Sequence, residues 1–365
     1  MSLALESRTS SGPSDLSLED YLRRHVASFS PVPRAVISIA ELSAGVWSVE
    51  LEGGSRLVAK HQAFGSSTAG APDDLLLVEF KVLNILNEHG CDVPRALTVD
   101  PETRFIYLEH CGDRTLDDRA QESGVSPDLS AKLVAGFCRI EKVLSAQREV
   151  LLPHVSRAAT RGHHAEVASS APAEAQEGLA MLLSHCDARS AAGQALASCL
   201  HDIWMTLSGR EPTLASTDFN ARNVVIDSTS TTVSFIEFAK IGWDWPERRL
   251  VQYATSLGAG REDGEFICPL SPESIEFYAK NAIDGAFALD GHHILFHLQA
   301  AAMLCRSLAQ PSLPRHRALL HAWQRPQHRL RQLVNTLASP LTSDTPAADF
   351  RSLFSEAVQP FIDRE

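Results

Sequence analysis

The sequence lacks the features that mark several classes of protein. Its seven cysteines form no CxxC pair and their number is odd, which argues against a disulfide framework and for reduced thiols in a cytosolic compartment. The first residues, MSLALESRTSSGPSDLS, carry no basic segment followed by an apolar run, so we expect no signal peptide. No stretch approaches the roughly 20 consecutive apolar residues that cross a membrane. These absences predict a soluble, cytoplasmic protein.

Positive charge is also scarce. The chain holds 33 Lys and Arg against 45 Asp and Glu, which gives a formal net charge of −12. This balance disfavours nucleic acid or an anionic membrane as the main partner. An acidic protein can attract a cationic substrate, although the simpler interpretation is that the acidity aids solubility.

Length and hydrophobic periodicity predict two lobes. With 365 residues, the chain can form one large two-lobed unit or two ordinary domains. Residues 1–33 are expected to be an N-terminal arm with one short amphipathic helix. Residues 34–111 predict the order strand, strand, strand, helix, strand, strand, with a tight turn at residues 52–55 around a Gly-Gly pair. The helix is expected to begin at residues 72–74 and to end at Gly90.

The pattern changes after Cys111. Residues 112–365 predict a mainly helical lobe, because Ala and Leu recur at helical spacing over residues 128–212 and again toward the C-terminus. The segment SSAPAEAQEG, residues 169–178, is expected to be a loop or a frayed insert. A short β-rich patch over residues 214–238 interrupts the helices.

A lysine and a glutamate in the first lobe are candidates for a buried ion pair. Lys60 lies on a predicted strand, where a lone lysine is usually a surface charge. In the following helix, Glu79 shares the apolar face of Leu76, Leu83 and Leu86. Burying an unpaired carboxylate is unfavourable, so we expect Lys60 to pair with Glu79. The alternative is that Glu79 is solvated at the border of the apolar stripe.

The segment STDFNARNVVID, residues 216–227, carries Asp218 and, five positions later, Asn223. This is the D-x-x-x-x-N spacing of a kinase catalytic loop, in which the carboxylate accepts the proton of the attacking hydroxyl and the amide oxygen helps to hold Mg²⁺. The next strand ends at Glu237, which a hairpin would place near Asn223. The segment alone could also be an Asx-rich turn between two strands. Lys60, Glu79 and Glu237 occur in the order found in kinases, and this favours the kinase interpretation.

With these segments the chain resembles the aminoglycoside phosphotransferase family of protein-kinase-like small-molecule kinases. The similar segments are LSAGVWSVELEGGSRLVAK, VEFKVLNILNEHGCDVPRAL, FIYLEHCGDRTLDD and LASTDFNARNVVID with VSFIEFAKIG. The resemblance implies an α+β fold with two lobes, as in protein kinases. Residues 34–111 would form a small antiparallel-sheet N-lobe that binds the nucleotide. Residues 112–365 would form a large, mainly helical C-lobe with the catalytic loop and the acceptor-binding region.

The resemblance implies an ATP site in the N-lobe. Lys60 would contact the α- and β-phosphates and be held by Glu79. Residues 43–47, with Ser43 and Gly45, would cover the phosphates. The backbone at the interlobe hinge would bind the adenine through Glu109, His110 and Cys111.

The resemblance also implies a catalytic site in the C-lobe. Asp218 would be the catalytic base, with Asn223 and Glu237 as ligands of Mg²⁺. The chain departs from the family in two places. The family usually has His-Gly-Asp where this chain has Ser216-Thr217-Asp218, so an imidazole is lost beside the loop. Glu237 replaces the metal-binding Asp, which adds about 1.5 Å of reach but keeps a hard oxygen ligand.

We therefore expect an ATP- and Mg²⁺-dependent phosphotransferase that transfers the γ-phosphate to a hydroxyl of a small molecule, with an amine-bearing antibiotic or metabolite as one candidate. The two departures leave a second possibility, a pseudokinase that binds nucleotide without turnover. A kinase acting on protein is disfavoured, because no activation-loop and A-P-E signature follows Glu237. The acceptor, the choice between ATP and GTP and the oligomeric state stay open at this point.

Two further motifs invite other interpretations. His293 and His297 lie four residues apart, the helical spacing of a zinc pair. No third ligand is evident, so we do not expect a metal site there. Asp244, ahead of Pro246 and Glu247, is more typical of a helix start than of an active-site acid.

Overall fold

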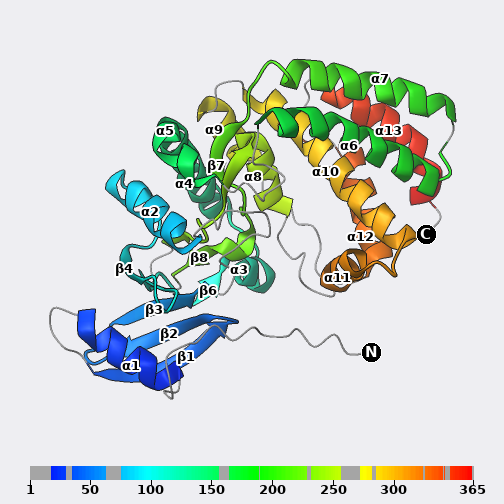
Figure 1. Cartoon of the computed structure of the whole chain (residues 1–365). Helices are drawn as coiled ribbons and strands as arrows, with labels where there is room; N and C mark the ends of the chain where they lie inside the picture. Colours follow the sequence, from blue (N-terminus) through cyan, green and yellow to red (C-terminus); the bar gives the residue numbers. More distant parts are fainter. Residues whose placement is uncertain are drawn as a thin grey trace. The chain divides into compact units, whose positions relative to one another are not determined.

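The computed structural model of the chain describes residues 18–29, 35–62, 75–155, 164–188, 190–227, 232–255, 272–281, 285–323, 325–339, 341 and 346–363. The chain divides into two compact units, residues 1–111 (unit 1) and residues 112–365 (unit 2). Unit 1 holds a small antiparallel sheet and unit 2 is mainly helical (Figure 1), so the expected α+β architecture is confirmed.

Unit 1 is built on a five-stranded antiparallel sheet with the strand order β1-β2-β3-β5-β4. Its elements are α1 (Leu18–Phe29), β1 (Val36–Ser43), β2 (Val46–Leu51), β3 (Arg56–His61), α2 (Leu75–Glu88), β4 (Ala96–Asp100) and β5 (Phe105–Glu109). This is the predicted order, and the turn at residues 52–55 and the helix end before Gly90 are present. The predicted start of α2 at residues 72–74 lies outside the described residues.

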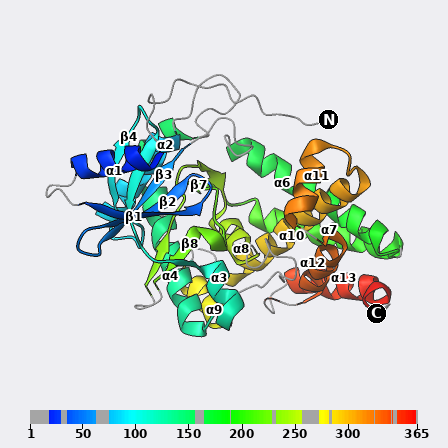
Figure 2. The same cartoon turned by 90° about the horizontal axis from the view of Figure 1, so that it is seen from below.

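Strand alternation assigns the two faces of the sheet to two different helices. On β3, Leu57 and Ala59 are buried in a cluster with Leu22 and Val26 of α1. Lys60 points to the other face, where its side chain meets α2. Because successive residues of a strand point to opposite faces, α1 and α2 cover opposite sides of the sheet, as Figures 1 and 2 show together. The helix expected in a separate N-terminal arm therefore contributes to the core of unit 1.

Unit 2 contains short strands between longer helices. The elements in chain order are β6 (Arg114–Thr115), α3 (Leu116–Ser123), α4 (Pro127–Ala146), α5 (Arg148–Leu151), η1 (Leu152–His154), α6 (His164–His185), α7 (Ser190–Leu207), β7 (Thr213–Ser216), η2 (Ala221–Asn223), β8 (Val224–Ile226), β9 (Val233–Phe235), β10 (Ile241–Asp244), α8 (Pro246–Thr255), α9 (Pro272–Asn281), α10 (Gly285–Ala309), α11 (Pro314–Trp323), α12 (Pro326–Ala338) and α13 (Ala347–Ile362). Strand β7 pairs with β10, and β6, β8 and β9 form a second sheet. The predicted β-rich patch is confirmed for β7, β8 and β9, whereas β6 and β10 were not predicted.

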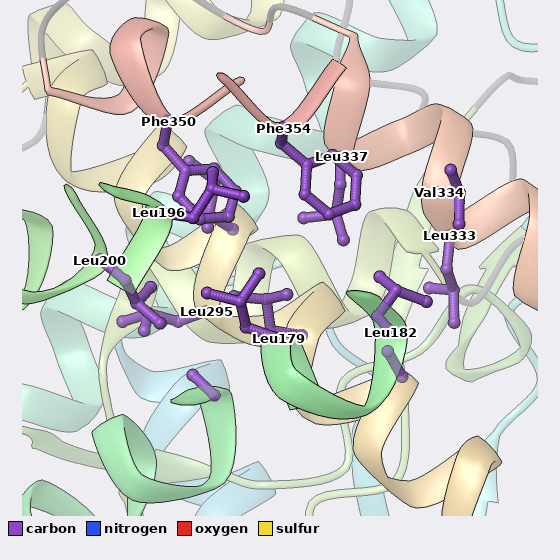
Figure 3. Packing of buried hydrophobic residues seen from close by; sticks show 14 of the residues in the cluster. Leu179, Leu182, Leu196, Leu200, Leu295, Leu333, Val334, Leu337, Phe350 and Phe354 are labelled. Carbon is purple, nitrogen blue, oxygen red and sulfur yellow. The ribbon is translucent and has the colours of Figure 1, made fainter. Parts of the chain in front are cut away.

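A hydrophobic core joins α6, α7, α10, α12 and α13 (Figure 3). The residues that meet there include Leu179, Leu182, Leu196, Leu200, Leu295, Phe350 and Phe354. The stripe of α12 predicted from helical spacing is fully buried in this core, and it consists of Leu330, Leu333, Val334 and Leu337. The helical periodicity of the C-terminal region is thus confirmed.

The prediction of a loop at residues 169–178 is wrong, because this segment lies inside α6. Pro172 removes one backbone donor from the helix, which weakens it without ending it here. The Gln299 side chain of α10 donates to the carbonyl of Ala171 at 3.4 Å and to the carboxylate of Glu174 at 3.0 Å. Packing on α10 therefore overrides the local preference of the sequence.

Gly178 in this segment allows α6 to approach α10 closely. A Cβ atom at Gly178 would lie 1.9 Å from the carbonyl oxygen of Leu298 and 2.7 Å from its carbonyl carbon. No side chain fits at that separation, so the backbones of α6 and α10 pack directly against each other. A residue that suggested a loop is thus required by helix packing.

Unit 2 begins with a glycine that has a close backbone neighbour. Gly112 has φ +149°, and a Cβ there would lie 2.7 Å from the carbonyl oxygen of Ile226 on β8 and 3.0 Å from the backbone nitrogen of Asp227. The first segment of unit 2 therefore runs against the backbone of β8 at a distance that only glycine allows.

None of the helices in the described part of the chain combines the length and the apolarity needed to cross a membrane. Six cysteines lie in that part, and none of the six is joined in a disulfide: Cys91, Cys111, Cys138, Cys186, Cys199 and Cys305.

We predict that Gly178→Ala lowers the free energy of unfolding by about 1–3 kcal/mol, because the added methyl group would push α6 away from α10. Gly193→Ala in α7 is the matched control, since the nearest atom to its added Cβ would be Leu183 Cδ1 at an ordinary 3.8 Å. The control should be neutral or slightly stabilising, because alanine is the better helix former. Urea denaturation followed by circular dichroism measures both variants. Equal stability of the two would contradict the packing argument.

Candidate functional site

In unit 1, Lys60 and Glu79 form the expected ion pair. Lys60 Nζ lies 3.0 Å from Glu79 Oε1 and 2.8 Å from Oε2. Lys60 is 7% exposed and Glu79 1% exposed, so both charges are buried. Gln62 Nε2 also donates to Glu79 Oε2, at 2.9 Å. These hydrogen bonds replace the water that the carboxylate loses and hold the ammonium at a fixed place on β3.

The turn between β1 and β2 is fastened to β3 next to this pair. The register pairs Ser43 with Val46 across the turn, and Val46 in turn pairs with Lys60. Gly45 has φ +80°, its carbonyl accepts from the backbone N–H of His61 at 2.8 Å, and a Cβ on it would lie 3.3 Å from the carbonyl of His61. The segment expected to cover the phosphates is therefore a tight turn that adjoins the lysine strand.

The expected adenine-binding backbone lies at the end of β5. The N–H of Glu109 donates to the carbonyl of Arg95 at 2.9 Å, and the Glu109 carboxylate accepts from Arg95 Nε at 3.1 Å. The thiol of Cys111 donates to the carbonyl of Glu109 at 3.7 Å. His110 and Cys111 are half-buried and follow the strand. The N–H of Glu109 is thus engaged within unit 1.

In unit 2, the loop after β7 brings Asp218 and Asn223 together. Asn223 Nδ2 donates to the carbonyl of Asp218 at 2.8 Å. The N–H of Asp218 donates to Ser216 Oγ at 3.3 Å, and Asn220 Nδ2 donates to Asp218 Oδ1 at 3.2 Å. Asn220 also caps η2 by accepting from the N–H of Arg222 at 3.0 Å. The loop is therefore tied at several points, and the carboxylate of Asp218, 30% exposed, projects from it.

Glu237 lies next to this loop in the hairpin formed by β8 and β9. The N–H of Ile236 donates to the carbonyl of Asn223 at 2.9 Å, which joins the end of β9 to the start of β8. Glu237 itself has φ +69°, a left-handed conformation that is uncommon for residues other than glycine. Such backbone strain costs on the order of 1–3 kcal/mol and clusters at functional sites. The residue expected as a metal ligand is thus held in a strained conformation.

The donor set of this segment suits a hard cation. The Nδ2 group of Asn223 is used by the carbonyl of Asp218, so the oxygen Oδ1 is the atom left to act as a ligand. Glu237 supplies a carboxylate. Mg²⁺ typically takes one or two such protein oxygens and completes its shell with phosphates and water. Among the described residues, no group of three or more His, Cys, Asp and Glu could hold a metal ion.

Sequence reasoning missed Lys240. Its Nζ lies 2.7 Å from Asp218 Oδ2, opposite the oxygen that Asn220 contacts. The N–H of Thr217 donates to the carbonyl of Lys240 at 3.0 Å, in line with the pairing of β7 and β10. Recognising IGWD as a strand paired with TLAS would have placed Lys240 opposite Thr217 and so pointed to this contact.

A buried arginine supports the strands that carry the loop. Arg249 of α8 is fully buried, and its guanidinium donates to both carboxylate oxygens of Glu141 on α4, at 2.8 and 2.5 Å. It also donates to the carbonyls of Thr213 at 3.3 Å and Asp244 at 2.9 Å. These two residues are the paired ends of β7 and β10. Arg249 therefore joins two helices to the strand pair whose first strand, β7, leads into the loop of Asp218.

His293 and His297 are core side chains of α10. Burial lowers the pKa of His297 to about 4 and holds the pKa of His293 well below its usual range. His297 Nδ1 lies 2.7 Å from the carbonyl of His293 and donates to it, and Arg351 Nη2 donates to His293 Nδ1 at 3.0 Å. Arg351 is paired with the buried Asp290. The two imidazoles are thus neutral members of a core network.

His292, the neighbouring residue, is also fully buried. Burial lowers its pKa to about 4, and its ring centroid lies 5.1 Å from that of Trp245. Neither ring nitrogen has a hydrogen-bond partner among the described residues. Protonation of this side chain inside the core is therefore unfavourable.

The chain is similar to several solved structures of small-molecule phosphotransferases and kinases. Macrolide 2'-phosphotransferase MphH from Brachybacterium faecium matches with a TM-score of 0.49 and 13% identity, over 84% of this chain and 98% of that one. Choline kinase LicA from Streptococcus pneumoniae matches with a TM-score of 0.44 and 12% identity, over 87% and 99%. An aminoglycoside-3'-phosphotransferase of type VIII matches with a TM-score of 0.40 and 18% identity, over 76% and 97%. No protein-family model and no curated protein matches the chain.

We predict that removing one member of the Lys60–Glu79 pair lowers the free energy of unfolding more than removing both members. Glu79→Leu leaves a buried ammonium without its counter-charge and should lower the free energy of unfolding by about 3–5 kcal/mol. The double variant Lys60→Met, Glu79→Leu should regain a substantial part of this loss. Glu276→Leu, which breaks the exposed pair of Glu276 with Lys280, is the control and should change stability by less than about 1 kcal/mol. Urea denaturation of the four proteins measures the coupling, and a double variant no more stable than Glu79→Leu would contradict it.

We predict that the buried imidazoles make the stability of the fold sensitive to acid. A histidine whose pKa is lowered on folding binds protons more readily when unfolded, so its contribution to stability is complete above about pH 6.5 and is lost as the pH falls toward 4. His292→Phe should remove about 3 kcal/mol of this pH-dependent loss. Unfolding measured at pH 7 and pH 4 tests the expectation, with His321→Phe at an exposed position of α11 as the control. If His292→Phe lost as much stability as the wild type between the two pH values, the buried imidazole would not be the cause.

Proposed function

We propose that the chain is an ATP- and Mg²⁺-dependent phosphotransferase that transfers the γ-phosphate to a hydroxyl group of a small molecule. The observation that carries the proposal is the loop of unit 2 in which the Asn223 amide binds the main chain of Asp218 and the end of β9 bonds to Asn223. The loop would supply the carboxylate base Asp218 and the amide oxygen of Asn223, and Glu237, which follows β9, would supply a second oxygen ligand. Phosphoryl transfer depends on such positioning and on charge neutralisation more than on covalent chemistry by the protein.

Asp218 has the contacts that a general base needs. One carboxylate oxygen accepts from Asn220 and the other from Lys240, which orients the group. Each carboxylate oxygen has a further acceptor position, so Asp218 can also accept from the hydroxyl of an acceptor. Asp218 would align that hydroxyl and take its proton as the oxygen attacks phosphorus.

Asn223 and Glu237 would hold Mg²⁺, through the amide oxygen and the carboxylate respectively. The bound ion would supply positive charge to the nucleotide phosphates. The strained backbone at Glu237 is consistent with a residue whose position is set by function rather than by local preference.

Lys60 would bind the α- and β-phosphates of ATP. Its ammonium is already positioned by Glu79, so little side-chain ordering is needed when the nucleotide arrives. The turn at Gly45, fastened beside Lys60, would lie over the phosphates, and the backbone from Glu109 to Cys111 would bind the adenine. These roles follow from the resemblance together with the geometry of unit 1.

The net charge indicates which class of acceptor to test first. A net charge of −12 favours a cationic acceptor over an anionic one, so an amine-bearing alcohol such as an amino sugar is the first class to test. We also infer a cytoplasmic location, where ATP is available and thiols stay reduced.

Asp218→Asn should lower turnover by at least about 100-fold, because it removes the base while keeping the shape of the side chain. Nucleotide binding should persist. Asp202→Asn, at an exposed position of α7, is the matched control and should leave turnover unchanged. The assay incubates each protein with ATP and Mg²⁺ over a panel of hydroxylated metabolites and antibiotics and reads product mass.

Three outcomes, from this assay, from calorimetry with ATP and from a protein acceptor, would count against the proposal. Unchanged turnover of Asp218→Asn would reject the catalytic assignment. Tight, Mg²⁺-independent ATP binding by calorimetry, with no product from any acceptor, would favour a nucleotide-binding module without turnover. Transfer to protein but to no metabolite would point to a protein kinase.

A further inference from the structure

We propose that Lys240 is a catalytic residue whose ammonium contacts the phosphoryl group as that group passes to the acceptor. The inference rests on the proposed function and deepens it. It adds a positive charge to the site that the D-x-x-x-x-N spacing does not assign.

The backbone of unit 2 places Lys240 beside Asp218. Ile241 of β10 pairs with Ser216 of β7, and the N–H of Thr217 donates to the carbonyl of Lys240 at 3.0 Å. The side chain then extends to Asp218, where Nζ lies 2.7 Å from Oδ2. The proximity of the ammonium and the carboxylate is thus set by strand pairing within one unit.

The exposure of this pair argues against a mainly stabilising role. The side chains of Lys240 and Asp218 are 56% and 30% exposed, in contrast to the buried Lys60–Glu79 pair. Exposed ion pairs contribute only about 0–1 kcal/mol. A lysine on a flexible four-carbon stem can exchange one anionic partner for another while its backbone stays fixed.

The chemistry brings a new anionic partner to this ammonium. A hydroxyl that donates to Asp218 has its oxygen about 2.7 Å from the carboxylate. That oxygen attacks phosphorus from about 3–3.5 Å. The transferred group therefore passes within roughly 6 Å of the carboxylate that Lys240 contacts, which is within reach of a small movement of the lysine side chain.

In the transfer step Lys240 acts only through its charge. The acceptor oxygen forms a bond to the γ-phosphorus, the bond from that phosphorus to the bridging oxygen breaks, and ADP leaves. The hydroxyl proton passes to Asp218, while Lys240 keeps its proton and offsets charge on the equatorial oxygens. Asn220 still holds Asp218 Oδ1 at 3.2 Å, so the base stays oriented when Lys240 turns to the phosphoryl group.

The test compares Lys240→Met, which removes the charge, with Lys240→Arg, which keeps it. Lys240→Met should lower kcat about 100-fold, while KM for ATP and the affinity for ADP stay within about threefold. Lys240→Arg should restore a large part of kcat, because the cation is retained. Lys280→Met, which breaks the exposed pair with Glu276 on α9, is the matched control and should leave kcat unchanged.

The readouts separate a catalytic role from a structural one. A catalytic role predicts that Lys240→Met keeps the melting temperature of the wild type and its affinity for ADP, and that arginine rescues kcat. A kcat within about threefold of wild type in Lys240→Met would overturn the role of Lys240 and leave the proposed function intact. A loss of kcat that follows the melting temperature and is not rescued by arginine would also overturn it. If the wild type transfers phosphate to no acceptor, the proposed function fails and this inference fails with it.

Discussion

The buried guanidinium of Arg249 holds together the helices and strands of unit 2 that carry the loop of Asp218. It lies at the meeting point of α4, α8, β7 and β10, and it is fully buried. A buried guanidinium is tolerated only when a counter-charge and several acceptors surround it, and Glu141 and two strand carbonyls meet that need. The register of β7 against β10 follows, and with it the position of the loop that β7 leads into. One buried charge thus fixes where an exposed carboxylate and an exposed ammonium meet.

The same physical rule recurs in other parts of the chain. In unit 1, Lys60 and Glu79 join a strand to a helix that are separated by residues 62–74. In the helical core, Arg351 of α13 joins Asp290 of α10 to carbonyls at the end of α12. Buried ion pairs add little net stability relative to apolar packing, but leaving one partner alone is strongly unfavourable. In this protein, they fix which elements lie next to each other.

What could be predicted from the sequence was local in origin. The alternation of β3, the apolar stripe around Glu79 and the D-x-x-x-x-N segment each depend on spacing within a few residues, so the sequence predicts their elements. The Lys60–Glu79 contact is predictable as well, because a carboxylate on an apolar helix face needs a counter-charge. The pairing of β10 with β7, and hence the partner of Lys240, depends on residues more than twenty positions apart. The helical state of α6 through Pro172 depends on α10, which lies more than a hundred residues further on. Interactions of this kind leave no periodic signal in one sequence.

The glycine at position 112 has a consequence for any rearrangement of the chain. Because the backbone of β8 occupies the space of a side chain there, the start of unit 2 accepts no other residue without displacement. A chimaera that grafts a foreign first unit onto unit 2 must therefore splice before that glycine and keep it. The junction is defined by contact with the sheet beneath it as much as by its place in the sequence.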